Sequence, residues 1–178
     1  MVKMMDAIEA LRTRSSIRKF TDLELTDEQV QELLKVMVAA PSAGNKQPWR
    51  IYVIRDETIK RKLAIGAGDQ GFITAAPVIF VVCRVPEESA ARYRDRGRDF
   101  YSIQDTAAMT QNLLVAAHAM GLGACWVGAF NDNAIVAAIE CPQGVLPVAI
   151  IPVGYPAVPG QPRGRRPLDA VVTYIPKK

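Results

Sequence analysis

The sequence predicts a single globular domain that mixes α-helices with β-strands, and three observations support this prediction. The 178 residues are 49% hydrophobic and 22% charged, a balance that lets one domain bury a sizeable core. Several segments place apolar residues at three- and four-residue steps, which is typical of helices. Between them lie short apolar runs with β-branched residues, which are typical of strands.

The composition excludes several kinds of function. The three cysteines lie far apart without CxxC spacing and there is a single histidine, so we expect neither a disulfide framework nor a bound metal. The net charge of +4 comes with interspersed acidic residues and no recognition-module pattern, so we expect no nucleic-acid partner. No segment approaches the ~20 apolar residues of a membrane-spanning helix, and the N-terminus lacks a signal-peptide pattern. We therefore expect a cytoplasmic protein without a membrane partner.

The first half of the chain predicts two helices, a loop, and then strands separated by a helix. Apolar residues at three-residue steps predict a helix over residues 4–12. Thr26 and Gln29 match a capping box, so a second helix is expected from there until Pro41. The remaining elements are expected to be a strand over 50–54, a helix over 56–65 and a strand over 75–83 that is buried on both faces.

The second half predicts one long helix among shorter elements. Residues 86–98 are strongly charged and are expected to form a mobile flap or an exposed helix. The helix expected over 103–120 is apolar around more than one face, which indicates burial by the core or by another subunit. Its last turn carries His118, for which a structural role is favoured over catalysis. The other expected elements are a strand over 124–132 that ends in small residues before a helix, a strand over 146–153, a proline-rich arm over 154–167 and an exposed strand over 170–175.

Two cationic clusters lie near the ends of the chain. Arg14, Ser15, Ser16 and Arg18 belong to a hydroxyl-rich turn after the first helix, and the second cluster spans residues 163–166. Guanidinium groups and serine hydroxyls are natural partners of phosphate oxygens. If the two clusters meet, they form an anion clamp. If they do not, they are solvated surface charge.

The loop over residues 41–49 contains two prolines, a glycine and several polar side chains. Asn45 and Gln47 carry the donors and acceptors that could read the polar edge of a planar heterocycle. Composition alone favours a turn in which Asn and Ser bond to their own backbone. The buried-looking Cys83 and Cys125 are expected to be inert core thiols.

Five segments, taken in order, resemble the FMN-dependent nitroreductase family, and the resemblance spans essentially the whole chain. No one segment is specific, but the five in this order and at these spacings are. The segments are Arg14–Phe20, Pro41–Trp49, Ala76–Ile79, Gly121–Phe130 and Arg165–Leu168.

The resemblance implies an α+β fold in which helices flank a central, mostly antiparallel sheet. It implies one nitroreductase-like FMN-binding domain over residues 1–178. It also implies an intertwined homodimer with exchange of the C-terminal arm and two FMN molecules at the interface.

The same resemblance implies a cofactor-binding set with three parts. The two cationic clusters would hold the ribityl phosphate, a loop from the partner subunit would reach the flavin ring, and the backbone at Gly128 and Ala129 would meet its N5 and O4 side. Gln70 would lie at the pyrimidine edge. The full set is Arg14, Ser15, Ser16, Arg18, Ser42, Ala43, Asn45, Gln70, Trp126, Val127, Gly128, Ala129, Arg163 and Arg165.

The implied activity is that of an FMN-dependent NAD(P)H oxidoreductase. NADH or NADPH would give hydride to flavin N5 and leave, and a small aromatic acceptor (a nitro compound, a quinone or an enone) would stack in the same place, which is a ping-pong cycle. No catalytic side chain is expected because the flavin carries the chemistry. The alternatives are a flavin-fragmenting enzyme, a reductive dehalogenase, a non-catalytic flavin-binding protein, or a basic interaction module without flavin.

The sequence departs from the large nitroreductases in two places. Where those proteins have an acidic residue and a glycine beside N5, this chain has Gly128 and Ala129. The chain is also short, so the insertions that cover the pocket in larger members are reduced to residues 92–98. We expect substrate choice to reside in that segment.

Overall fold

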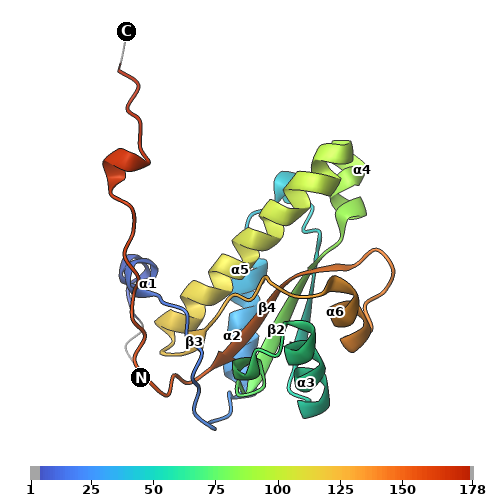
Figure 1. Cartoon of the computed structure of the whole chain (residues 1–178). Coiled ribbons are helices and arrows are strands. Elements are labelled where there is room, and N and C mark those ends of the chain that lie inside the picture. Colours follow the sequence, from blue (N-terminus) through green and yellow to red (C-terminus); the bar gives the residue numbers. More distant parts are fainter. Residues whose placement is uncertain (1–4, 177–178) are drawn as a thin grey trace.

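The centre of the molecule is a four-stranded antiparallel sheet with strand order β1-β2-β4-β3 (Figure 1). The structure is a computed structural model that describes residues 5–176. Val78–Cys83 are fully buried because helices cover both faces of the sheet, so the prediction of a strand buried on both sides is confirmed. The strands are β1 (Trp49–Ile54), β2 (Val78–Arg84), β3 (Gly123–Ala124) and β4 (Leu146–Gly154).

The two-residue period of β2 divides the core into two halves. Phe80 and Val82 face α2 (Asp27–Val38) and α5 (Ser102–Ala119) on one side of the sheet. Ile79 and Val81 pack on the other side with α3 (Glu57–Gly66) and α6 (Asp132–Ala138). The hydrophobic core therefore lies on both faces of the sheet, between the sheet and the helices.

Local capping sets where the helices begin. Thr26 accepts from the Gln29 N–H while the Gln29 side chain accepts from the Thr26 N–H, so the predicted capping box starts α2. Asp6 accepts from the N–H groups of Ile8 and Glu9, which starts α1 (Ala7–Thr13) later than the expected residue 4. Residue 4 itself lies outside the described residues.

Helix α5 is the longest element, and its two ends serve different segments (Figure 1). The charged segment before it forms α4 (Pro86–Arg96), followed by the short π-helix η3 (Gly97–Tyr101), so the prediction of an exposed helix there is confirmed. These elements and the loop containing η1 (Ala43–Asn45) lie at the N-terminal end of α5. Helix α1 lies at its C-terminal end.

The strand expected over 124–132 is shorter than predicted, and proline explains the difference. Only Gly123 and Ala124 pair as β3 with β4, after which Val127 makes an isolated bridge to Ile150. Between these pairs Cys125 lies opposite Pro152, which accepts a hydrogen bond from Cys125 but has no N–H to return one. The chain therefore leaves the ladder early.

The strand expected over 170–175 is wrong. Leu168–Ala170 form the 3-10 turn η4, closed by the bond from the Val171 N–H to the Leu168 carbonyl, and the residues after it pair with no strand of the described chain. A strand needs a neighbouring strand to pair its backbone, and residues 5–176 provide none for this segment. Figure 1 shows this C-terminal arm leading away from the body of the molecule. Within residues 5–176, no helix has the length and apolar character needed to span a bilayer.

Candidate functional site

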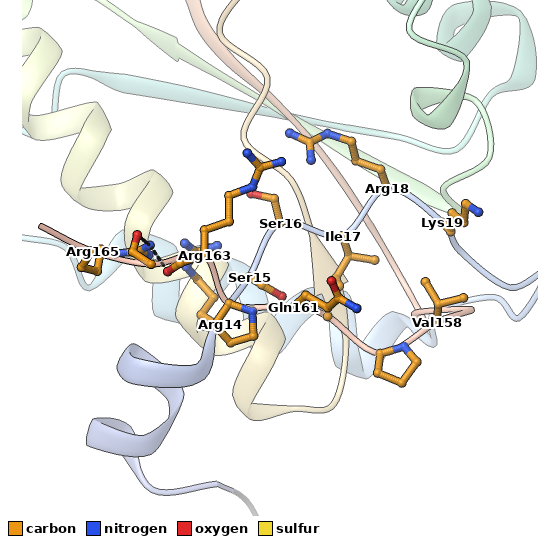
Figure 2. Close-up of a pocket in the computed structure, with 14 residues that line it drawn as sticks. Arg14, Ser15, Ser16, Ile17, Arg18, Lys19, Val158, Gln161, Arg163 and Arg165 are labelled. Atoms are coloured by element: carbon orange, nitrogen blue, oxygen red, sulfur yellow. Dashed lines mark hydrogen bonds between the residues drawn. The ribbon is translucent and has the colours of Figure 1, made fainter.

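The segment after α1 and the C-terminal arm enclose a cavity of about 950 Å³ (Figure 2). Residues 14–19 line one side and residues 158–165 line the other. The two cationic clusters predicted from the sequence therefore meet. The condition for an anion clamp is fulfilled within a single chain.

Backbone bonds hold the first of these segments between β3 and the arm. The Ile17 N–H donates to the Ala124 carbonyl at 2.9 Å, and the Ala157 N–H donates to the Lys19 carbonyl at 2.9 Å. The Ile17 side chain is buried and anchors the segment to the core. Gly123 permits this close approach, because a Cβ there would lie 2.7 Å from the Ile17 Cβ. The residues on either side of Ile17 are thereby aimed at the cavity.

The cavity is strongly electropositive. Arg14, Arg18, Arg163 and Arg165 take part in no ion pair among residues 5–176. Arg165 instead donates to the carbonyls of its neighbours Arg163 and Gly164 at 2.7 and 3.2 Å, and Figure 2 shows Arg14, Arg163 and Arg165 close together. With the hydroxyls of Ser15 and Ser16, these groups can surround an anion with charge-assisted hydrogen bonds.

The predicted set omitted two polar residues that also line this cavity, Lys19 and Gln161. Lys19 follows Arg18 directly in the same basic turn, so its position in the sequence was sufficient to include it. Gln161 lies in the proline-rich arm, which has no helical or strand periodicity from which the orientation of its side chain could be predicted.

The loop with Ser42, Ala43 and Asn45 lies away from this cavity, near the start of α5 (Figure 1). The Ala43 N–H donates to Asp105 Oδ1 at 3.0 Å, and the Gln47 N–H donates to Ser42 Oγ at 3.0 Å. Gly44, Asn45 and Gln47 all have φ between 50° and 56°. Non-glycine residues in this region are strained and tend to cluster at functional sites.

Asp105 holds this loop, and the sequence-based set did not include it. Its side chain is buried in the first turn of α5, and its second oxygen has no partner within the described part of the chain. Burial raises the pKa of Asp105, while the bond from the Ala43 N–H opposes that shift. The contact joins residues 62 positions apart, so local patterns in the sequence could not reveal it.

The length of α5 keeps the loop and the cationic cavity apart. Asp105 binds the loop in the first turn of the helix, and His118 in its last turn contacts Thr13, the residue before Arg14. Thirteen residues of helix at a rise of 1.5 Å separate these points by about 20 Å. One chain therefore does not bring the loop and the cavity to the same place.

The remaining predicted residues lie on connecting segments outside the cavity. Gln70 donates its side-chain amide to the Ala67 carbonyl at 2.7 Å, so that donor is already engaged. Val127 is buried and paired with Ile150, whereas Trp126, Gly128 and Ala129 are exposed. Among the described residues, the N–H groups of Gly128 and Ala129 have no hydrogen-bond partner. They remain available to a ligand's acceptor atoms.

His118 contacts Thr13 Oγ1 through Nε2 at 2.9 Å, a position that supports a structural role beside the clamp. Burial lowers the pKa of His118 below its ordinary 6.5, the charge of Arg14 adds to this effect, and Glu9 opposes it. The helix C-terminus favours a cation there, but burial and Arg14 outweigh that preference.

We expect the free energy of unfolding to decrease as the pH falls through the His118 titration. Because the folded pKa lies below the unfolded one, the unfolded chain binds the proton first, and stability present above about pH 6.5 is lost below it. Urea unfolding of the wild type and of His118→Gln between pH 8 and pH 5 measures this. The stability difference between the two proteins should change across that range. A constant difference would contradict the assignment.

Comparison with known proteins shows what the chain is similar to. The Nitroreductase family model matches residues 11–67 and 64–155. A Methanothermobacter thermautotrophicus protein with the provisional name NADH dehydrogenase/NAD(P)H nitroreductase is 34% identical over 160 residues, covering 88% of this chain and 80% of that protein. The FMN reductase (NADPH) of Bacillus subtilis is 30% identical over 181 residues, covering 94% of this chain and 73% of that protein.

A solved structure gives the same result for the fold. The NADPH:FMN oxidoreductase from Vibrio harveyi, determined in complex with NAD⁺, aligns with a TM-score of 0.87 at 27% identity. The alignment covers 97% of this chain and 78% of that one. The family model spans more than half of the chain, and two relatives of at least 30% identity are covered over more than two thirds of their length. The chain belongs to the nitroreductase family.

Proposed function

We propose that this protein is an FMN-dependent NAD(P)H oxidoreductase of small acceptors, built as one FMN-binding domain over residues 1–178. The observation that carries the proposal is the cationic cavity between residues 14–19 and 158–165. Relatives named as NAD(P)H nitroreductase, FMN reductase and NADPH-flavin oxidoreductase support it.

The residues present fit the phosphate end of FMN. Four guanidinium groups without acidic partners among the described residues, two serine hydroxyls and Lys19 face a cavity of about 950 Å³. That volume lies within the range of ordinary ligand sites. A phosphate dianion there would compensate a charge that the protein leaves unbalanced. We assign Arg14, Ser15, Ser16, Arg18, Arg163 and Arg165 to this contact.

The residues that we assign to the ring end of the flavin do not lie beside the phosphate clamp of the same chain. The loop with Ser42, Ala43 and Asn45 lies about 20 Å from the clamp along α5. We therefore infer that the loop of one copy serves the clamp of another in a homodimer. The arm has the apolar side chains for such an exchange, since Leu168 is 74% exposed and Tyr174 is 87% exposed.

Bound FMN would supply hydride transfer between NAD(P)H and the acceptor. The protein's part is to bind and orient it. The free N–H groups of Gly128 and Ala129 would donate to acceptor atoms of the ring, and the nearby Trp126 side chain is 38% exposed. Positive charge near the pyrimidine edge would stabilise negative charge that develops on the ring. We assign Gln70 to the pyrimidine edge of the ring, beside the Ala67 carbonyl to which its amide donates.

The visible absorption spectrum of the purified protein tests the proposal. We expect an oxidised flavin spectrum that bleaches on anaerobic addition of NADPH or NADH, because the clamp retains the cofactor and the ring remains open to the donor. Sedimentation of the same sample should give twice the 19.5 kDa mass of the chain. A nitro compound, a quinone and an enone added afterwards should restore the oxidised spectrum to different extents, which ranks the acceptors.

The other outcomes separate the alternatives. A flavin that stays oxidised with both donors would favour a non-catalytic flavin-binding protein. Loss of the flavin during turnover would favour a flavin-fragmenting enzyme, and halide release from a halogenated aromatic would favour a dehalogenase. A colourless protein that takes up no FMN on soaking would contradict the proposal altogether.

A further inference from the structure

Helix α4 carries arginines that the proposed flavin contacts do not use. Arg98, just after the helix, pairs with Glu87 at 2.7 Å and with Asp95 at 2.6 Å, while Glu88 is taken by Arg50. Among residues 5–176, neither Arg92 nor Arg96 has an acidic partner. Glu87, Glu88 and Asp95 are therefore engaged by Arg98 and Arg50, and within the described chain Asp99 pairs with no cation. Arg92 and Arg96 keep exposed guanidinium charge.

Aromatic rings hold these two guanidinium groups in place. The Arg96 guanidinium lies 5.0 Å from the ring centre of Phe100 and 5.2 Å from that of Tyr101, and it donates to Tyr101 Oη at 2.9 Å. The Arg92 guanidinium lies 5.4 Å from the ring centre of Tyr93. Cation–π contacts of this kind position a guanidinium and leave donors free. Tyr93 and Tyr101 pack edge to face at 5.1 Å, which joins the two positions into one surface.

This surface lies against the loop that we assign to the flavin. A Cβ on Gly44 would meet Tyr93 Oη at 2.5 Å and Arg92 Nη1 at 3.1 Å, so both side chains cover that loop. The same loop contains Ser42, Ala43 and Asn45. The inference below rests on the proposed function at this point, since it takes the loop to reach the flavin of the other copy.

The backbone beneath the surface is tightly fixed. Arg94 has φ 51° and ψ −137° and breaks the helix, and Gly97 packs so closely that a Cβ would lie 2.5 Å from the Ser89 carbonyl oxygen. Arg84 on β2 braces the turn by donating to the Arg98 carbonyl at 2.8 Å and to Ser102 Oγ at 3.1 Å. Arg92 and Arg96 are thus presented from a braced turn rather than from a loose flap.

We propose that Arg92 and Arg96 bind an anionic group of the ligand that stacks on the open face of the flavin ring in the proposed site. The ligand class is a small aromatic compound bearing a carboxylate, sulfonate or phosphate, with Tyr93 beside its ring. A pyridine nucleotide presents the same chemistry through its phosphates. The donor and the acceptor occupy the same place in turn in a ping-pong cycle. The anionic group could therefore belong to the aromatic acceptor or to the pyridine nucleotide, and the experiment below distinguishes the two.

Two nitro compounds of similar size and different charge test the acceptor. We expect the wild type to bind and reduce 4-nitrobenzoate in preference to 4-nitrobenzyl alcohol. Arg92→Gln and Arg96→Gln should each lower this preference about tenfold, which is the weakest loss expected of a charge-assisted hydrogen bond. Added salt should lower it as well. Arg61→Gln on α3 removes an exposed charge that makes no ion pair within the described chain, and it is the matched control.

The donor arm compares NADPH with N-benzyl-1,4-dihydronicotinamide, which lacks phosphates. A selectivity loss confined to this arm would identify the anion as the nucleotide phosphate. Equilibrium dialysis of the two nitro compounds gives a readout that needs no turnover, so a failure of the oxidoreductase proposal leaves this test intact. If neither arm shows a charge preference that Arg92→Gln and Arg96→Gln reduce, the inference is overturned.

Discussion

Replacing Arg14 and Arg165 together by Ala should release FMN while the fold survives. Both side chains line the cationic cavity and neither has an acidic partner among the described residues, so their replacement breaks no ion pair there. Each lost charge-assisted bond to a phosphate costs about 1.5–3 kcal/mol. The affinity for FMN should therefore fall by roughly two to four powers of ten, with coupling between the two neighbouring positions adjusting the sum.

Fluorescence titration with FMN and with riboflavin measures this loss. Riboflavin lacks the phosphate, so its affinity should differ little between the wild type and the double variant. The matched control replaces Arg12 and Arg166, which are sequence neighbours of the clamp residues but do not line the cavity. An unchanged FMN affinity in Arg14→Ala/Arg165→Ala would place the phosphate elsewhere.

Gly123→Val should weaken both the fold and the cofactor site. A Cβ at this position would lie 2.7–2.8 Å from three carbon atoms of the buried Ile17 side chain, so the segment carrying Arg14, Ser16 and Arg18 must move. Overpacking of this kind costs about 1–3 kcal/mol. The displaced segment should also lose FMN, although no charged group has been changed.

Chemical unfolding and FMN titration on the same samples separate the two effects. Gly71→Ala is the control, because a Cβ there meets no atom within 4 Å and its backbone does not have positive φ. A Gly123→Val protein of reduced stability that binds FMN as tightly as the wild type would falsify the link between β3 and the clamp.

The sequence predicted those parts of the fold that local chemistry determines. The apolar run at β2 and the capping box at Thr26 both appear where their patterns placed them. The cationic turn at Arg14 likewise follows directly after the first helix, as the order of residues in the sequence indicates. Whether the two cationic clusters meet cannot be read from local patterns, because the distance between them depends on the path of the whole chain.

Longer-range features escaped prediction for physical reasons. The strand after Ala124 ends early because of Pro152 on the neighbouring strand, which cannot be read from residues 124–132 alone. The segment 170–175 has strand-like composition but no partner within the described chain. Asp105 resembles any polar interruption of a helix until the fold brings Ala43 to it.

The C-terminal arm has a consequence for the life of a newly made chain. Leu168, Tyr174 and Ile175 are 74%, 87% and 91% exposed on a segment without regular backbone pairing. Extended exposed termini are preferred sites of proteolysis, and exposed apolar residues promote aggregation. In the proposed dimer a second copy would bury this tail. A monomer that has not formed the dimer would then be degraded by quality-control proteases. The amount of protein in the cell would therefore depend on how much of it has dimerised.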